Sequence, residues 1–464
     1  MSAPSAPFVR AVVLNWNGGT YVLDAVEALL RTRWPADRFR VVVVDNASTD
    51  GSDREIERRF PVVDLRRSPT NGGFPANNLA LGDLDGVDYV ALVNNDAFVE
   101  PDWLAPLVAA AEAEGDLGAV CPKLVFAPRF AALDVVCAGP SSPQVWVSGV
   151  EVAGVERWRY AWFGPGWHAQ EADPSGGDER DGAASAERAQ PRARRKLESQ
   201  PARIGLPVIA PLEAPARCRV RLAADEPTVL TLREGAASRV ASVGPEPTWH
   251  DVDAVGETFD VVQNLGSLLL EGGYGADRGF QQVDDGRWDE PAEVFSWCGG
   301  GVLLRPAYLA EVGLFDERLF MYYEDTDLAW RGRASGWRYR AEPASRIRHL
   351  HATSSVVGSA RFDHFVERNR LAVLTKNAPS RVAARAVAVS VRELVAMTRH
   401  DLGAARARRR PPTLPAARRR ARTLGAYAAM LPALLRERSR LRRRQRVADA
   451  EILAWMQPRS VHPF

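Results

Sequence analysis

The stretch "LFDERLFMYYEDTDLAWRGRASGW" (314–337) places three acidic residues, Glu324, Asp325 and Asp327, directly behind an aromatic run. Carboxylates next to apolar side chains cost desolvation energy unless a cation, a donor or a helix N-terminus offsets it. A helix that begins near Glu324 accounts for one or two of these acids. Asp325 would then lie in the first helical turn with its carboxylate free to face a ligand, and Asp327 could cap the helix or pair with Arg331.

Two further polar clusters follow apolar segments that read as strands. "VDYVALVNNDAFVEPDWL" runs into Asn94, Asn95 and Asp96, and "VVVVDNASTDGS" reaches Asp45. In open α/β sheets the ligand crevice lies beyond such strand ends. Carboxylate oxygens there suit a hard divalent cation that is shared with substrate phosphates. Turn formation explains the same residues, because Asn and Asp favour turns, so both interpretations stay open at this stage.

Two more motifs carry weaker signals. "SRIRHLHATSS" places His349 and His351 two residues apart, so on a strand their side chains point the same way. A histidine on a strand is more often structural than a ligand, and either role is possible here. The run Gly299–Gly301 lets a backbone or a ligand approach closely.

Residues 9–125 alternate between the periods of strands and helices, which favours a mostly parallel sheet covered on both faces. "VVVVD" is apolar at four successive positions, as a strand buried on both faces should be. The expected strands are 9–15, 39–45, 61–67, 87–93 and 118–124, and the expected helices are about 20–32, 51–59, 74–83 and 101–114.

The pattern changes after this region. Residues 130–258 are rich in short strand signals and indicate an inserted β-rich module with a polar, flexible loop at about 171–204. Strand and helix signals return over 259–377, and residues 378–464 form a basic helical C-terminal region. We therefore expect boundaries at 8–129, 130–258, 259–377 and 378–464.

The composition, 46% hydrophobic and 25% charged over 464 residues, is that of an ordinary globular protein. The four cysteines form no CxxC pair, and the chain shows neither a signal peptide nor an apolar run long enough to span a bilayer. These features predict a cytoplasmic protein that can associate with the inner face of the plasma membrane.

Charge is concentrated at the C-terminal end, where residues 380–464 hold 20 Arg and 5 acidic residues, a net charge of +15. Such a tail could be a solvated helical face, a nucleic-acid patch or a membrane anchor. The apolar segment 424–435 between basic clusters fits an interfacial helix. We expect an anionic membrane surface as the partner and no nucleic acid.

Taken together, the motifs resemble those of glycosyltransferase family 2 enzymes of the GT-A fold, in the rhamnosyltransferase-like and galactofuranosyltransferase-like branch. The resemblance covers about residues 8–126 and 259–377. It rests, in order, on "VVLNWNG", "VVVVDNASTDGS", "NGGF…NN", "LVNNDAFVEPDWL", "WCGGGVLLRP", "VGLFDERLFMYYEDTDLAWRGRASGWRYR" and "HLHATSS…ERNRL". It implies an α/β GT-A fold with a mostly parallel sheet, an inserted β-rich module and a C-terminal helical extension.

The resemblance also implies an activity. Such an enzyme moves a sugar, rhamnose or galactofuranose-like, from a nucleotide-diphosphate sugar to a hydroxyl of a cell-envelope glycan or lipid-linked acceptor, with inversion. By this likeness residues 8–129 bind the nucleotide-sugar, and residues 259–377 bind the acceptor and carry the catalytic groups. The implied cofactor is a divalent metal, Mn²⁺ or Mg²⁺.

Roles for single residues follow from the same likeness. Asp325 stands at the general-base position with Glu324 beside it. Asp96 and His349 stand at the metal-binding positions, with His349 preferred to His351 because it lies 24 residues after Asp325. Donor contacts are implied for Asn15, Asn17, Asp45, Asn46, Asn78, Asn95 and Asp96, and acceptor contacts for Trp297, Gly299 and Gly300.

Two alternatives are kept. A nucleotidyltransferase also combines an α/β scaffold with acids and a metal, but the loop "LNWNGGTYVLD" lacks the basic residues of its phosphate loop. A catalytically degenerate scaffold is the second, because Asn94 stands where the family motif has an acid.

Overall fold

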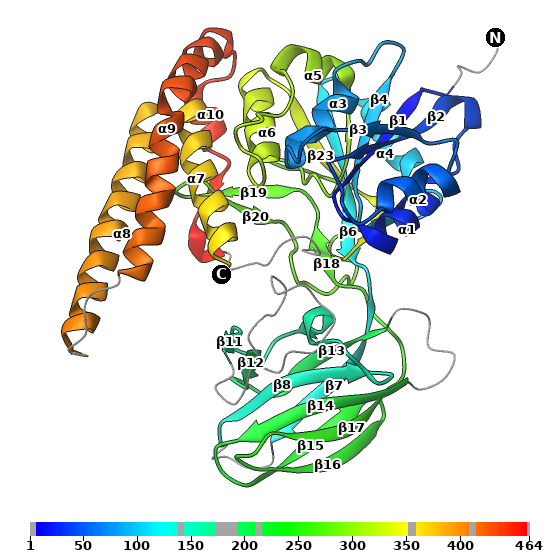
Figure 1. Cartoon of the computed structure of the whole chain (residues 1–464). Helices are drawn as coiled ribbons and strands as arrows, with labels where there is room; N and C mark the ends of the chain where they lie inside the picture. Colours follow the sequence, from blue (N-terminus) through cyan, green and yellow to red (C-terminus); the bar gives the residue numbers. More distant parts are fainter. Residues whose placement is uncertain are drawn as a thin grey trace. The chain divides into compact units, whose positions relative to one another are not determined.

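The computed structural model describes residues 6–137, 143–172, 193–208, 216–350, 359–407 and 414–461 (Figure 1). The chain divides into two compact units. Unit 1 comprises Met1–Val125, Gln263–Phe280 and Gly286–Phe464, and unit 2 comprises Phe126–Val262 and Gln281–Asp285. The predicted insertion at 130–258 lies inside unit 2, whereas the predicted C-terminal region is part of unit 1.

The parallel part of the unit 1 sheet follows the predicted order of elements. It contains β1 (Val9–Asn15), β2 (Phe39–Asp45), β3 (Asp64–Arg67) and β4 (Tyr89–Asn94), arranged β4-β1-β2-β3. The last five residues of β2 are buried, as its continuous apolar sequence predicts. Asn15 pairs with Asp45 in the register, so the polar ends of β1 and β2 lie side by side.

The sheet continues beyond β4 with strands from later in the chain. β22 (Gly301–Leu304) runs antiparallel to β4 and to β6 (Leu117–Phe126). Next come β23 (Arg338–His349) and β21 (Ala292–Glu293), and β5 (Ala97–Val99) also pairs with β23. Because His349 lies opposite Ala97 in this pairing, the end of β23 is fixed next to the residue that precedes β5.

Six helices accompany the strands in this part of the described chain (Figure 1), namely α1 (Gly19–Leu30), α2 (Ser52–Arg59), α3 (Asn78–Leu81), α4 (Leu104–Ala113), α5 (Pro306–Val312) and α6 (Glu324–Ala334). The helix expected over 74–83 is shorter and divided, with a 3₁₀ turn at Phe74–Asn77 before α3. Gly73, with φ of 69°, makes the tight entry to this turn.

Unit 1 ends in a helical array made of α7 (Ala360–Asn377), α8 (Ser380–Ala407), α9 (Pro415–Arg444) and the short α10 (Asp449–Leu453). α7, α8 and α9 pack side by side (Figure 1). Their buried residues share one core with Phe295 and with Trp330 of α6. The C-terminal region is therefore an integral layer of unit 1 and not a separate domain.

This packing corrects one expectation about the segment 424–435. Tyr427 and Leu434 are buried in the shared core, and Leu424 and Leu431 pack against it. The apolar side of α9 is thus turned toward its neighbours, so α9 is not the interfacial helix. None of the described helices carries the extended apolar stretch that a bilayer crossing requires.

A small sheet completes unit 1. It contains β19 (Ser267–Leu270), β20 (Tyr274–Asp277) and β24 (Met456–Gln457), in the order β20-β19-β24. Asp277, the last residue of β20, becomes important for the site described below.

Unit 2 is built from two antiparallel sheets that enclose their own core. One contains β10 (Trp162–Phe163), β13 (Ala202–Val208), β7 (Arg129–Cys137), β15 (Thr228–Glu234) and β16 (Ala237–Val243). The other contains β11 (Glu171–Ala172), β12 (Ala193–Lys196), β8 (Val145–Val152), β14 (Ala216–Ala224) and β17 (Thr248–Ala254), with β9 (Val155–Glu156) beside β8.

The prediction of a flexible loop at 171–204 is wrong at both ends of this segment. β11 and β12 pair with each other, and β13 begins at Ala202. Ala202 and Ile204 are fully buried where β13 pairs with β7, so a few apolar residues in a polar segment are enough to order it. Residues 173–192 of the expected loop lie outside the described residues.

Candidate active site

A buried polar network joins the carboxyl ends of β1 and β2. Asn15 is fully buried, and its Nδ2 donates to Asp45 Oδ1 at 2.9 Å and to Ser52 Oγ at 2.8 Å. Asp45 Oδ2 in turn accepts from the backbone N–H of Ser48 at 3.1 Å. Asn17 has a positive φ of 51°, and its Oδ1 accepts from the backbone N–H of Thr49 at 2.7 Å. Three residues that are predicted to contact the nucleotide-sugar, Asn15, Asn17 and Asp45, therefore lie together at one edge of the sheet.

Asn95 belongs to the same neighbourhood. A Cβ placed on Gly18 would lie 2.6 Å from Asn15 Oδ1 and 2.8 Å from Asn95 Nδ2, so both amides press against the glycine backbone. Gly18 thus keeps the two amides close to the turn that follows β1. Whether they contact a nucleotide stays a prediction.

Asn46 and Asn78 connect this edge to the acidic stretch. Asn46 Nδ2 donates to the carbonyl of Gly73 at 3.1 Å, and its Oδ1 accepts from the N–H of Gly72 at 2.8 Å. The amide of Asn78 makes two hydrogen bonds with the backbone of Phe315, at 3.0 and 3.1 Å. Both residues have a clear structural use, and their predicted contact with the donor stays a prediction.

Asp96 and His349 are brought into direct contact by the β5–β23 pairing. Both side chains are 6% exposed, and His349 Nε2 lies 2.9 Å from Asp96 Oδ1. The other ring nitrogen, Nδ1, lies 2.8 Å from Gln263 Oε1, which can only accept. The N–H at Nδ1 therefore points to Gln263, and Nε2 faces the carboxylate. Asn94 Nδ2 is a further neighbour, 3.3 Å from Nε2.

The side chains of Asp96 and His349 are suited to bind a divalent cation. A carboxylate oxygen facing an imidazole nitrogen needs a proton or a cation between them, and the Gln263 contact is the usual support of a metal-binding histidine. Within the described residues no group of three or more His, Cys, Asp and Glu side chains could hold a metal ion. Two protein ligands suffice where substrate phosphates and water supply the remaining oxygens. His351 lies outside the described residues.

Asp325 lies in the first turn of α6, as the sequence predicts. Its Oδ1 accepts from the backbone N–H of Thr326 at 2.6 Å and from Thr326 Oγ1 at 3.2 Å, and the backbone N–H of Gly299 also bonds to the carboxylate. Burial raises the pKa of Asp325, and these donors oppose the shift. A carboxylate with a raised pKa is suited to proton transfer.

Glu324 is only 7% exposed, and its Oε2 has no hydrogen-bond partner among the described residues. Burial and the adjacent Asp325 charge raise the pKa of Glu324 well above its ordinary value. An unpartnered buried carboxylate oxygen is costly, so its position next to Asp325 points to a place for a polar ligand group.

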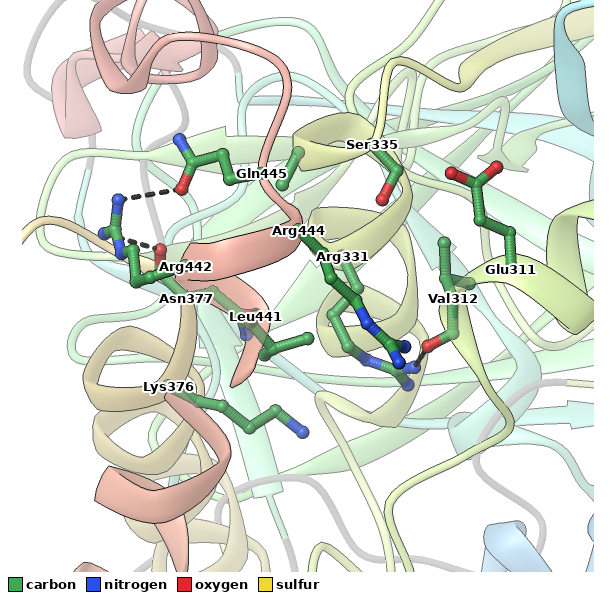
Figure 2. A pocket seen from close by; sticks show the side chains of 11 residues that line it. Glu311, Val312, Arg331, Ser335, Lys376, Asn377, Leu441, Arg442, Arg444 and Gln445 are labelled. Carbon is green, nitrogen blue, oxygen red and sulfur yellow. Dashed lines mark hydrogen bonds between the residues drawn. The ribbon is translucent and has the colours of Figure 1, made fainter. Parts of the chain in front are cut away.

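Asp327 is structural. It is fully buried and accepts from Arg331 Nε at 3.0 Å, Lys376 Nζ at 2.8 Å and Asn377 Nδ2 at 2.8 Å. This cluster ties α6 to α7. Figure 2 shows the small pocket beside it, where Arg331 and Lys376 point inward. With a volume of about 30 Å³ the pocket has room for about one water, which excludes it as a nucleotide site.

The turn that leads into Glu324 is strained. Phe320, Tyr322 and Tyr323 have φ of 63°, 68° and 70°, a region that costs side-chain-bearing residues about 1–3 kcal/mol each. Asn369 of α7 holds it, with Nδ2 2.8 Å from each of three carbonyls, those of Leu319, Met321 and Tyr322. Asn369 was given no role from sequence, although it stands in the "ERNRL" motif.

Asp277 was also missed. Its carboxylate accepts from Asn264 Nδ2 at 2.6 Å. Burial and, to a smaller extent, the charge of Asp325 raise the pKa of Asp277 to about 6, although the Asn264 bond and His349 oppose the shift. Because the charges of both Asp325 and His349 act on Asp277, the predicted base and the predicted metal ligands lie near one another. The only sequence signal was an isolated acid near the glycines 272–273 and 275.

The glycine run contacts both the predicted base and a predicted metal ligand. A Cβ on Gly299 would lie 2.5 Å from the ring of Phe74, and one on Gly300 would lie 3.4 Å from His349 Cε1. Gly299 thus serves Asp325 through its N–H, and the next residue lies against His349. Trp297 is placed differently from expectation. It is fully buried against Phe315, with ring centroids 6.1 Å apart, so its ring is not available for stacking on an acceptor sugar.

Comparison with known proteins identifies a family for the N-terminal part of unit 1. Residues 11–127 match the model of the family described as glycosyl transferase family 2. The family match therefore covers the segment from β1 to β6, and with the sheet described above the chain has the α/β GT-A fold that the motifs predicted.

Individual relatives are similar over short segments. The poly(ribitol-phosphate) beta-N-acetylglucosaminyltransferase TarS of Staphylococcus aureus is 29% identical over 102 residues, which are 21% of this chain and 18% of that protein. The N-acetylglucosaminyl-diphospho-decaprenol L-rhamnosyltransferase of Mycobacterium tuberculosis is 41% identical over 68 residues, 14% of this chain and 22% of that protein. The matches thus span about a fifth of each relative, and the second supports the rhamnosyltransferase-like branch.

Among solved structures, the chain is similar to the crystal structure of GalNAc-T7 with UDP, GalNAc and Mn²⁺. The TM-score is 0.43 at 11% identity, over 81% of this chain and 48% of that one.

The contact between Gly73 and the strained turn generates a prediction. A Cβ on Gly73 would lie 1.9 Å from the carbonyl oxygen of Phe320, and the φ of 69° disfavours any side chain. Gly73→Ala should lower the free energy of unfolding by about 1–3 kcal/mol. Gly115→Ala is the matched control, because nothing lies within 4 Å of its Cβ position. Equal melting temperatures for the two variants would contradict the close packing of this loop on the turn.

Proposed function

We propose that the chain is an inverting glycosyltransferase that moves a sugar, rhamnose or galactofuranose-like, from a nucleotide-diphosphate sugar to a hydroxyl of a cell-envelope glycan or lipid-linked acceptor. One observation carries the proposal. Successive glycines connect Asp325, through the Gly299 N–H, to the Asp96–His349 pair, against which Gly300 lies. A base and a diphosphate-binding pair at opposite sides of one space are what a single displacement requires.

In the proposed reaction the acceptor hydroxyl attacks the anomeric carbon while its proton passes to the Asp325 carboxylate. The bond between that carbon and the diphosphate breaks on the opposite side, and the nucleotide diphosphate leaves with the electron pair. Thr326 and Gly299 hold the Asp325 carboxylate in place. Glu324, with its unpartnered Oε2, would accept a hydrogen bond from a hydroxyl of the acceptor.

Asp96 and His349 are the residues that would hold the divalent ion, Mn²⁺ or Mg²⁺. When bound, such an ion supplies positive charge to the departing diphosphate. Gln263 fixes the His349 ring, and Asn94 fills the space where an additional acid would otherwise lie. Asn15, Asn17, Asp45 and Asn95 would line the nucleotide end of the site.

The proposed base gives a direct test. Asp325→Asn should reduce the transfer rate by about 10²–10⁴-fold and leave donor binding intact, because proton transfer is lost and the shape is kept. In the wild type, kcat/KM should fall as the pH is lowered through the raised pKa of Asp325, since only the carboxylate accepts a proton. The control is Asp24→Asn, on the exposed side of α1. Turnover near that of the wild type would remove Asp325 from the base role.

The proposed metal pair gives a second test, by thermal shift with UDP or dTDP, with and without Mn²⁺. A ligand that binds only the folded state at 100 times its Kd adds about 2.7 kcal/mol of stability. The metal-dependent part of this gain should vanish in His349→Ala and Asp96→Asn. It should persist in His400→Ala, whose side chain is 83% exposed. A gain of equal size in all variants would place the metal elsewhere.

The same assays separate the alternatives. A degenerate scaffold would neither transfer nor hydrolyse any nucleotide sugar, with or without metal. A nucleotidyltransferase would release pyrophosphate from a nucleoside triphosphate and a sugar phosphate.

An anionic membrane surface is the proposed partner of the C-terminal helices, and the supporting observation is on α8. Val391, Val395 and Leu402 are 45–46% exposed and lie on one side of this helix. Arginines repeat every seven residues beside them, are exposed, and form no ion pair with any described residue; they are Arg385, Arg392, Arg399 and Arg406.

The two acidic residues of α8 do not neutralise this face, because both interact with α9. Glu393 pairs with Arg420, and Asp401 Oδ2 accepts from the backbone N–H groups of Ala416 and Ala417 at 3.2 Å. An apolar stripe flanked by unpaired arginines is the pattern of a helix that lies in a membrane interface.

Flotation with liposomes that contain anionic lipid tests this face. Replacing Arg385, Arg392, Arg399 and Arg406 with Gln should lower binding at least about 100-fold, since each arginine near an anionic surface contributes about 1 kcal/mol. The control replaces four exposed arginines of α9 with Gln, at positions 418, 436, 440 and 443. Equal flotation of the two variants would exclude α8 as the docking face.

A further inference from the structure

A second cavity of unit 1 lies among α7, α8 and α9 and takes no part in the proposed transfer. Its volume is about 560 Å³, within the usual range for small-molecule sites. The three helices that form it lie side by side in Figure 1. α7 and α9 contribute most of the lining, and α8 contributes Met397.

The lining is cationic. It holds four arginines, Arg361, Arg419, Arg420 and Arg422, against two acids, Asp363 and Glu367. Glu367 pairs with Arg420 and is also bonded to Arg370 and Ser390, which leaves Asp363 as the remaining acid of the lining.

Several of these guanidinium groups have unused capacity. Arg420 pairs with Glu367 at 3.1 Å and with Glu393, but its buried Nε has no partner among the described residues. Arg361, Arg419 and Arg422 form no ion pair within the described part of the chain. Arg361, Arg419 and Arg422 are exposed, so water and salt screen the repulsion among these like charges, and an anion that binds between them would compensate their charge directly.

The surroundings of the neighbouring His364 are also positively charged. His364 Nδ1 lies 3.0 Å from Thr423 Oγ1, at the wall of the cavity. Burial, followed by the positive charges of Arg368 and Arg422, lowers the pKa of His364. The cavity is therefore positive in charge and has a neutral hydrogen-bonding wall.

From this geometry we infer that the cavity binds a diphosphate-bearing ligand. The planar guanidinium groups match phosphate oxygens, which they bind through paired N–H donors. The four arginines exceed the two acids of the lining by two charges, so a single carboxylate would compensate half of this excess, whereas a diphosphate carries at least two negative charges. The volume leaves room for a sugar or a lipid stem next to the phosphates.

One lining residue of the cavity also contacts the turn that precedes the proposed base. Arg361 lies over the ring of Phe320, 5.9 Å from its centroid, and over that of Phe365 at 5.8 Å. Phe320 belongs to the strained turn that precedes Glu324 and Asp325. The diphosphate of a lipid-linked acceptor would have its sugar close to this turn, and this source of the diphosphate rests on the proposed function. The product nucleotide is the other source.

Isothermal titration with inorganic pyrophosphate, in the presence of EDTA, tests the binding without any transfer reaction. The full chain should bind one equivalent, and Arg419→Gln with Arg422→Gln should weaken binding at least tenfold. Arg361→Gln, on a different helix, should also weaken it, so the test survives if the double variant fails to fold. The matched control, Arg436→Gln with Arg440→Gln at exposed positions of α9 outside the cavity, should bind as the wild type does.

Two results would overturn the inference. One is unchanged affinity in both pocket variants, and the other is loss of binding in Asp96→Asn, which would place pyrophosphate at the donor site. Competition then identifies the source. A prenyl diphosphate that displaces pyrophosphate better than UDP supports the lipid-linked acceptor, and the reverse order supports the product nucleotide. Because no sugar is transferred in these titrations, failure of the proposed enzymatic function would leave their outcome unaffected.

Discussion

The position of the proposed base depends on one amide side chain. The Nδ2 of Asn369 in α7 lies within hydrogen-bond distance of three carbonyls of the turn at 319–323, and three residues of this turn have left-handed conformations. The buried Asp327–Lys376 pair ties the same two helices together one turn further along α6, at 2.8 Å. Together they convert a strained loop into a rigid platform, and the first turn of α6 is held where Gly299 can bond to Asp325.

This dependence explains why α7, α8 and α9 belong to unit 1. A helix that has to hold strained backbone needs a core of its own, and α7 finds one with α8, α9 and Trp330. The arginines of the C-terminal region therefore have different roles, which depend on their positions. Some arginines serve as internal ion pairs, some face the α7–α9 cavity, and others remain on the outer face of α8.

Much of this could be predicted from the sequence where the signal was local. The strand β2 was evident from four successive valines, and the position of Asp325 from three acids at a helix start. The contact of Asp96 with His349 was predicted only through family resemblance, since it depends on the register of β5 with β23. The roles of Asn369, Gln263 and Asp277 were not predicted, because they arise from contacts with distant segments that no local sequence pattern encodes.

The errors have the same origin. Trp297 was expected to contact the acceptor because of its motif, but its ring is fully buried beside Phe315. The apolar segment 424–435 suits a membrane interface when α9 is considered alone, and α7 covers it in the fold. In both cases the sequence showed that burial was needed and did not show which surface would provide it.

The chain order of these parts sets the order in which they can form during synthesis. Unit 2 is complete once residue 285 has left the ribosome, whereas the turn at 319–322 waits for Asn369. The nascent chain therefore holds a folded β-module and a finished β1–β4 sheet well before it has a proton acceptor in place. Any truncation ahead of α7 would remove Asn369 and leave the turn before Asp325, the proposed base, without the contacts that hold it.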